Sequence, residues 1–390
     1  MKSQFVKTII IILSVFLTTS LSVYSEKFEF SFKNGEKYNL SIRSNIRVYT
    51  NDKYIGLNSK EMKGIQSVSI LEDNNYLVQG FYYVMDKTMR NKINIGYKVK
   101  KEKPINFILQ PNGNMKSTID FPPLKSIPIF PDKTINYGDV FENLGIVNIS
   151  LNENNESINN PVYVKTVYMG KKEFMGQSYD FFNIEYKYSN NDNSKTHING
   201  EHKINYYFNN DSGMPVYMED HFTEEIFFNK EKTKRIGFNL YFYKPIEKMD
   251  KEKLLENLEI IIDKNEDFTI QKKDDGIHIN ISNLQFKANS IELLTLEDRK
   301  KIDLIYKTLK SIDKRSFIIT GHTASTGDSE AEMTLSTERA EYIANILIAK
   351  GIEAGRVIYY GKGSSEPIAP NDSEENMKKN RRVEITILED

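Results

Sequence analysis

Along residues 26–248, apolar and polar residues alternate with a period of two, in short runs separated by Asn, Asp, Gly and Lys. This period places successive side chains on opposite faces of a strand, so each run predicts a strand with one buried face. The regular turn residues between the runs indicate an antiparallel all-β region, a sandwich or a barrel. The clearest runs are Phe28–Phe32, Tyr76–Val84, Lys92–Lys98, Pro161–Tyr168, Phe181–Tyr188 and Ile236–Phe242.

A cluster of prolines interrupts this pattern near residues 121–135. It contains Pro122, Pro123, Pro128 and Pro131, and proline cannot donate a hydrogen bond to a central sheet position. The cluster predicts a crossing loop, an edge or a boundary between two β halves. Gly35 and Gly138 begin similar segments in the two halves, the pattern that an internal repeat would give.

After Pro245 the period changes from that of strands to that of helices. Residues 249–273 are predicted to link the two parts of the chain. They contain a predicted helix within 250–262 and lead into a second domain over 274–390. That domain begins with a predicted strand at Ile277–Ile281. Thr295 is the expected cap of a helix, with Asp298 three residues later, and the buried face follows a helical period. That face consists of Ile302, Ile305, Leu309 and Ile312.

The remaining elements complete an α+β domain. A strand at Phe317–Ile319 precedes a helix that Ser336 is expected to cap and Gly351 to end in a left-handed conformation. Two more strands are predicted at Val357–Tyr360 and Val383–Ile387. The fold class is therefore an all-β, sandwich-like N-terminal region of one or two halves, followed by a βαβαββ domain with two helices on a mixed sheet.

The first residues have the pattern of a secretory signal. Lys2 and Lys7 precede an apolar run over residues 9–17, and small and polar residues follow. Residues 1–25 are predicted to be this signal, with cleavage near Ser25–Glu26. The run is shorter than the about 20 apolar residues of a spanning helix, although an uncleaved anchor is the alternative.

Composition and charge narrow the function. A net charge of −1 gives no basic field for nucleic acid. The chain has no cysteine, which excludes disulfides, thiol catalysis and the lipid-bearing cysteine of a lipoprotein. Its five histidines lack metal-ligand spacing, and we find no catalytic motif. We therefore expect a non-catalytic protein without metal or cofactor.

One polar loop carries candidate binding chemistry. Gly321 and Gly327 bracket His-Thr-Ala-Ser-Thr, between a predicted strand and a predicted helix. By itself this is most simply a connecting loop. Arg339 is expected in the first turn of the following helix, where the helix dipole disfavours a cation by roughly 0.3–1 kcal/mol. A guanidinium there indicates either an anion site or a structural ion pair.

From about residue 274 onward, the chain resembles the peptidoglycan-binding OmpA-like (OmpA/MotB) C-terminal domain. The resemblance implies that an aspartate in this loop holds the ammonium, and the helix arginine the carboxylate, of the diamino acid in the peptidoglycan stem peptide. Arg339 matches that arginine. The other matching ligand-site positions are Asn289, Thr323, Leu335, Ser336 and Arg382.

Two positions depart from the family pattern. Ala324 stands where the family has its aspartate, and Glu332 replaces a common asparagine. Losing one charge-assisted bond costs roughly 1.5–3 kcal/mol. Three outcomes are open: Asp328 or Glu332 supplies the missing carboxylate, the ligand contains a different diamino acid, or the domain has kept the fold and lost the ligand.

These inferences predict an exported protein, periplasmic or associated with the outer membrane, that binds the peptidoglycan stem peptide weakly or with altered recognition. Outer-membrane proteins are expected as further partners. One alternative is an outer-membrane β-barrel tethered to the wall, and another is an OmpA-like fold that serves only as a structural or interaction module. A flagellar stator is rejected, because the apolar run lacks an acidic residue. The Asn-, Lys- and Ile-rich composition resembles spirochaete members of the family.

Overall fold

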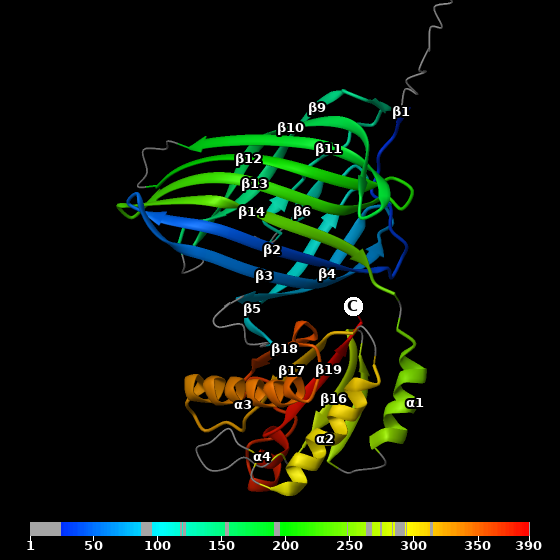
Figure 1. Cartoon of the computed structure of the whole chain (residues 1–390), viewed down its shortest axis with the longest axis vertical. Coiled ribbons are helices and arrows are strands. Elements are labelled where there is room, and N and C mark those ends of the chain that lie inside the picture. The colour runs from blue at the N-terminus through cyan, green and yellow to red at the C-terminus, as the bar shows by residue number, and fades with distance from the viewer. Residues whose placement is uncertain are drawn as a thin grey trace, which may run out of the picture.

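The structure is a computed structural model. It describes residues 25–389, apart from 87–95, 118, 120–121, 153–155, 191–195, 248, 263–266, 274, 283, 285–292, 294 and 313–314. Nearly all of the predicted signal segment, and Asn289, lie outside the described residues. Figure 1 shows a strand-rich N-terminal part above a smaller part that contains the helices.

The N-terminal part is all β, as predicted. Its strands are β1 (Ser25–Glu26), β2 (Lys37–Thr50), β3 (Lys53–Ile70), β4 (Tyr76–Asp86), β5 (Tyr97–Leu109), β6 (Met115–Ser117), β7 (Leu124–Lys125), β8 (Ile135–Asn136), β9 (Val140–Ser150), β10 (Ser157–Phe174), β11 (Gln177–Asn190), β12 (Thr196–Asn209), β13 (Met214–Phe228) and β14 (Glu231–Pro245).

Most of these strands belong to one strongly curved antiparallel sheet (Figure 1). The hydrogen-bonded order runs β7-β9-β10-β11-β12-β13-β14-β2-β3-β4-β5-β6. The end strands β6 and β7 approach through Ser126, whose hydroxyl accepts a hydrogen bond from the Met115 amide at 2.8 Å. Strands from both sides of the proline cluster therefore share one sheet that curls around its own core.

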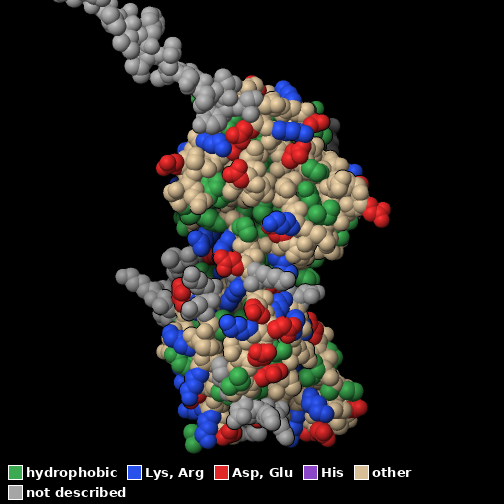
Figure 2. All heavy atoms as spheres, turned by 90° about the vertical axis from the view of Figure 1, so that its right-hand side faces the viewer, with side chains coloured by type: hydrophobic (Ala, Val, Ile, Leu, Met, Phe, Trp, Pro, Cys, Tyr) green, Lys and Arg blue, Asp and Glu red, His purple; other side chains and the backbone are tan. Residues whose placement is uncertain are grey.

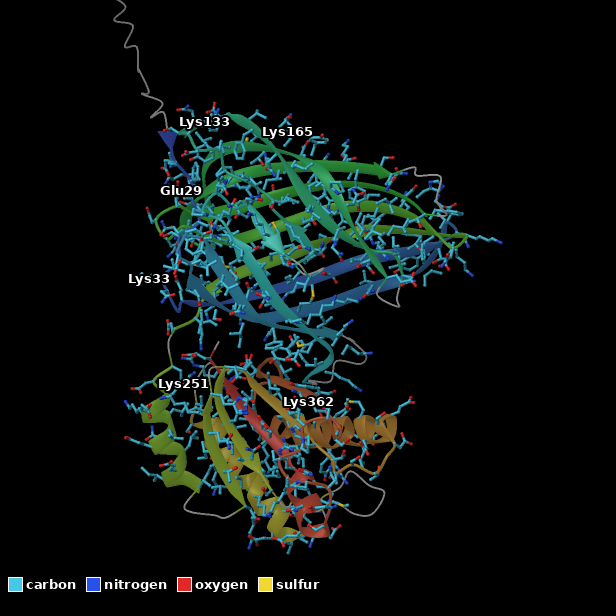
Figure 3. All side chains as sticks on the ribbon, turned by 180° about the vertical axis from the view of Figure 1, so that it is seen from behind. Glu29, Lys33, Lys133, Lys165, Lys251 and Lys362 are labelled. Atoms are coloured by element: carbon cyan, nitrogen blue, oxygen red, sulfur yellow. The ribbon has the colours of Figure 1, made fainter. Side chains whose placement is uncertain are left out.

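Alternation along each strand separates the inside of this sheet from the outside. On β10, Val162 and Val164 are buried within the core, whereas Tyr163 and Lys165 face outward, and Figure 3 labels Lys165. Hydrophobic burial on the concave side is the main stabilising contribution in a chain without disulfides. On the face that Figure 2 presents, both signs of charge are interspersed.

The prediction of a strand at Phe28–Phe32 is wrong. The segment makes isolated backbone hydrogen bonds, from the Phe30 amide to the Pro111 carbonyl and from the Ser31 amide to the Gly213 carbonyl. Phe28 instead packs within 5–6 Å, between ring centroids, of Phe130 and Phe182. The aromatic residues of this segment alternate with polar ones because their rings fill the space inside the curved sheet. The backbone of the segment does not pair as a strand.

The C-terminal part has the predicted helices on a mixed sheet. Its elements are α1 (Lys251–Ile262), β15 (Phe268–Lys273), β16 (Gly276–Ile281), α2 (Leu296–Lys310), β17 (Phe317–Gly321), α3 (Ser329–Ala349), the 3-10 turn η1 (Ala354–Arg356), β18 (Val357–Gly361), α4 (Glu374–Asn380) and β19 (Val383–Leu388). The order of its own strands is β15-β16-β19-β17-β18, in which β17 and β18 are parallel and the other neighbours antiparallel. β15 lies in the segment predicted as linker and entry, and it forms an edge strand.

The predicted helix ends in this part are confirmed at two positions and wrong at one. Thr295 and Asp298 form the predicted capping box of α2, and Gly351 has φ +112° directly after the last residues of α3. The predicted start of α3 at Ser336 is wrong. α3 begins at Ser329, because the Asp328 carboxylate accepts a hydrogen bond from the Ala331 amide at 3.0 Å and nothing between them and Ser336 breaks a helix.

The two faces of the C-terminal sheet have different partners. The helices pack on the face that presents Phe317, Ile319 and Val357. The opposite face presents Ile318, Ile358 and Leu388, which pack against Tyr83, Met85 and Val99 from β4 and β5 of the N-terminal part. β5 also extends the C-terminal sheet, since Tyr97 and Lys98 pair in parallel with Ile358 and Tyr359.

Charged groups reinforce this junction. The Glu389 carboxylate lies 2.7 Å from the Lys37 ammonium of β2 and 3.1 Å from that of Lys251, which Figure 3 labels at the start of α1. It also accepts a hydrogen bond from the Met249 amide at 2.9 Å. Among the residues that the structure describes, no helix has the length and apolarity needed to span a membrane.

Candidate functional site

The glycine-bracketed loop lies where β17, β18 and α3 converge. A Cβ atom on Gly321 would lie 2.1 Å from the Ser336 carbonyl oxygen, and one on Gly361 would lie 2.2 Å from the Ser336 hydroxyl. Only glycine allows α3 to approach the ends of both strands so closely. The close contact places Ser336 against the ends of β17 and β18. The loop follows β17, and Lys362 follows β18.

Backbone contacts fix the first half of the loop. The Thr323 amide donates to the Gly363 carbonyl at 2.9 Å, and the Gly363 amide donates to the Ser336 hydroxyl at 2.9 Å. Ala324 is buried, with 5% of its surface exposed. The structure therefore brings Thr323, Ala324 and Ser336 into one compact region.

Glu332 holds the second half of the loop. Its carboxylate accepts hydrogen bonds from the Gly327 amide at 3.1 Å and the Thr326 hydroxyl at 3.0 Å, and also from the Thr326 amide and the Ser364 hydroxyl. These bonds, the one from Ser364 above all, lower the pKa of Glu332. Glu332 is thus a buried, ionised organiser of the loop, while Asp328 caps α3 beside it.

A pair of asparagines connects the loop to α4. The Ser325 amide donates to the Asn371 side chain at 3.2 Å, and Asn371 accepts from the Asn380 amide group at 3.0 Å. Asn380 has no exposed surface and also bonds the Ile368 and Ala369 backbone. Our reading of the site residues missed this role. The signal available in the sequence was the position of Asn380, directly before Arg381 and Arg382.

Arg382 and His322 are two buried side chains of the candidate site. Arg382 is buried, and its guanidinium donates to the Glu366 carbonyl at 3.1 Å. The His322 amide donates to the Arg382 carbonyl at 3.0 Å. Burial, followed by the charge of Arg382, lowers the pKa of His322 to about 4, so its imidazole is neutral at physiological pH.

Arg339 does not occupy a first helical turn, and that part of our reasoning was wrong. It lies near the middle of α3, which spans Ser329–Ala349, one turn after Leu335. Both side chains are half-buried and share one side of the helix. Burial, and then the charge of Arg381, lowers the pKa of Arg339, but a guanidinium remains protonated. Arg339 is therefore a half-buried cation on α3.

Among the residues that the structure describes, no group of three or more His, Cys, Asp or Glu side chains is placed to hold a metal ion. What the arrangement provides is a half-buried guanidinium, a loop with a fixed backbone and a buried apolar position at Ala324. Such a site suits recognition of a small anionic group.

Residues 285–381 match the model of the OmpA family. The chain carries an OmpA-family domain. The match covers α2, β17, α3, β18 and α4, together with the loops that build the site. Arg382 and β19 follow directly after the matched residues.

Relatives resemble this chain through the OmpA-family domain. The probable lipoprotein YiaD of Escherichia coli is 33% identical over 30% of this chain and 54% of its own length. The peptidoglycan-binding protein ArfA of Mycobacterium bovis is 34% identical over 23% of this chain and 28% of its own. A solved outer membrane protein from Borrelia burgdorferi is 36% identical over 32% of this chain and 99% of its own, with a TM-score of 0.27. The chain thus spans about half the length of YiaD and less than a third of that of ArfA.

Proposed function

We propose that this chain is a non-catalytic cell-envelope protein that associates with peptidoglycan through its OmpA-family domain, with weakened or altered recognition of the diamino acid. The match to the OmpA family supports the association. So does the similarity to a relative described as peptidoglycan-binding. An exported location, periplasmic or at the outer membrane, is part of the same proposal.

One pair of residues carries the proposal: Arg339 is a half-buried cation on α3, and Ala324 stands where the family resemblance implies an aspartate. Arg339 is suited to hold a carboxylate of the stem peptide with two parallel hydrogen bonds. Ala324 offers nothing to an ammonium group. Recognition of a zwitterion by two opposite charges is thereby reduced to recognition by one.

The neighbouring acids are engaged elsewhere, which favours weakened binding over compensation. Asp328 accepts the Ala331 amide as the cap of α3. Glu332 accepts hydrogen bonds from Thr326, Gly327 and Ser364. Either carboxylate would have to give up these bonds to reach a ligand. The cost is about 1 kcal/mol for the Asp328 cap and roughly 0.5–1.5 kcal/mol for each hydrogen bond that Glu332 loses.

The deciding experiment restores the family aspartate. Ala324→Asp should increase the affinity for diaminopimelate-containing muropeptides by about 10- to 150-fold, the value of one charge-assisted hydrogen bond of roughly 1.5–3 kcal/mol. Adding Arg339→Ala should abolish that gain, because the two side chains hold opposite charges of one ligand. Calorimetric titration with purified muropeptides measures both effects.

Ser325→Asp is the matched control, since it adds the same charge one residue along, at an exposed position, and should give no gain. If Ala324→Asp folds but gains nothing, the pocket has diverged beyond this residue. If the unmodified chain already binds as tightly as the variant, an existing acid supplies the contact, and Asp328→Asn and Glu332→Gln identify which one. Tighter binding of muropeptides with another diamino acid would establish altered specificity.

A further inference from the structure

The concave side of the N-terminal sheet is not completely filled. Within the part of the chain that the structure describes, it contains an inner pocket of about 90 Å³ and an outer chamber of about 700 Å³. Ile42, Pro123, Leu124 and Tyr241 line both, so the two spaces adjoin. Packed interiors rarely leave voids larger than a water molecule, and small-molecule sites typically measure about 300–1,000 Å³.

The chamber has an open end and a closed end. The exposed turn residue Asn229, between β13 and β14, and Thr50, at the end of β2, both line it, so it reaches the surface at these hairpin tips. At the other end of the interior, Phe28, Phe130, Phe182 and Phe208 pack ring against ring. A ligand would therefore enter from the hairpin tips.

The inner pocket is apolar with one unsatisfied polar atom. Most of its lining is aromatic or aliphatic, including Phe30, Leu40 and Phe107. Gln66 also lines it and is 1% exposed. Its side-chain nitrogen donates to the Tyr82 hydroxyl, but its carbonyl oxygen has no partner among the described residues. Such an orphaned acceptor is unfavourable unless a guest molecule or water satisfies it.

The outer chamber adds a charged wall. The His202 imidazole is stacked between Tyr186 and Phe222, and its Nδ1 lies 2.9 Å from the Asp220 carboxylate. Its Nε2 has no hydrogen-bond partner in the described structure and lies 3.6 Å from the Glu224 carboxylate, which is 3.7 Å from Arg235. This wall thus contains two acidic side chains, Asp220 and Glu224, and two basic ones, His202 and Arg235, so neither sign of charge is in excess.

We propose that this interior binds the acyl chain of a lipid whose head group is zwitterionic or uncharged. The chain would lie on the apolar surface that runs from the chamber past Ile42 and Leu124 into the inner pocket. The head group would lie against His202, Asp220 and Glu224, where an N–H and carboxylate oxygens are available together. A simple anion such as a fatty acid would pair only with the cationic side chains of this wall and leave the two carboxylates without a counter-charge, whereas a zwitterion offers a counter-charge to both and should bind better. This site is separate from the loop around Ala324 and does not depend on the proposed peptidoglycan association.

Alternation along β2 supplies a matched pair of variants. Val48 lines the chamber, whereas its neighbour Arg47 is exposed on the outer face. Val48→Trp should fill the chamber, and Arg47→Trp adds the same ring outside it. Thr233→Trp, from β14 directly opposite Thr50, fills the same chamber as a second test.

The experiment uses the full chain purified without detergent. A fluorescent polyene fatty acid reports occupancy, and palmitate and a single-chain lysophosphatidylethanolamine compete for it. We expect saturable binding, stronger competition by the zwitterionic lipid, a roughly tenfold or greater loss of affinity in Val48→Trp and Thr233→Trp, and no change in Arg47→Trp. Circular dichroism verifies that each variant folds.

Three results would overturn the proposal. They are the absence of saturable binding by the unmodified chain, equal binding by a folded chamber-filling variant, and an equal loss in Arg47→Trp, which would indicate adsorption to the outer surface. Stronger competition by palmitate than by the zwitterionic lipid would overturn the assignment of the head group.

Discussion

At the scale of single residues, two buried histidines have opposite protonation states. Burial disfavours the charged form of His202, but the Asp220 and Glu224 carboxylates outweigh it and raise its pKa to about 9. For His322, burial and the charge of Arg382 act together and lower the pKa to about 4. His202 is therefore a buried cation in the N-terminal sheet, and His322 a buried neutral ring below the candidate site.

These shifts predict how stability depends on pH. An unfolded histidine titrates near pH 6.5. The contribution of His202 should be complete below about pH 6.5 and be lost as the pH rises through 9, because only the folded state then holds the proton. The contribution of His322 has the opposite sign: it is complete above about pH 6.5 and is lost as the pH falls towards 4, because the unfolded state gains a proton that the folded state excludes.

Urea unfolding at several pH values between 4 and 9 measures this dependence. His202→Phe should lower the free energy of unfolding at pH 7 by roughly 3 kcal/mol, since it leaves the buried Asp220 carboxylate without its cationic partner, while Glu224 keeps Arg235. It should also remove the decline between pH 6.5 and 9. His221→Phe is the control, because His221 is an exposed histidine on the next strand. An unchanged alkaline slope in His202→Phe would contradict the assignment.

At the scale of elements, the start of α3 determines what the neighbouring residues do. The helix begins two turns earlier than the sequence indicated, so Asp328 acts as its cap and Ser336 becomes an interior residue. From there the Ser336 hydroxyl donates to the Met333 carbonyl at 2.9 Å and accepts from the Gly363 amide at 2.9 Å. One serine thus joins α3 to the loop after β18.

Substitutions should distinguish these two roles. Asp328→Ala should cost about 1 kcal/mol of stability, the usual value of an N-cap. Ser336→Ala should cost roughly 1–3 kcal/mol, because it orphans the buried Gly363 amide. Ser329→Ala, the matched control at the first helical residue, should have little effect. Denaturant midpoints test all three, and a neutral Asp328→Ala would mean that another residue caps the helix.

At the scale of the whole molecule, the N-terminal part completes the C-terminal sheet. Helices cover one face, and β4 and β5 cover the other through Tyr83, Met85 and Val99. Parallel pairing of β5 with β18 and the Glu389 ion pairs add directional contacts at the same junction. Burial of apolar surface on both sides of the sheet therefore couples the two parts.

Met85→Asp should separate the parts, because it places an unpaired charge at a position with no exposed surface. We expect a larger radius of gyration by solution scattering and faster hydrogen exchange in β18. Met175→Asp, at an exposed turn between β10 and β11, is the control and should leave both unchanged. Unaltered scattering and exchange in a folded Met85→Asp protein would show that the junction does not depend on this apolar contact.

The sequence by itself determined the succession of elements, because period and capping are local properties. Alternation identified the all-β region, and the helical period with Thr295, Asp298 and Gly351 identified the ends of two helices. At Phe28–Phe32 the alternation wrongly predicted a strand. A local pattern shows which side chains are buried but not which part of the molecule buries them.

Only the tertiary structure decided which distant side chains meet. The Glu332 carboxylate is occupied because Ser364 and Thr326 reach it, and the Asn380 side chain is bonded by Ile368, Ala369 and Asn371 of the segment before α4. The second face of the C-terminal sheet is covered because β4 and β5 come from far earlier in the chain. The chamber inside the N-terminal sheet depends on how strongly the sheet curves. Each of these results from the packing of segments remote in sequence, which no local period encodes.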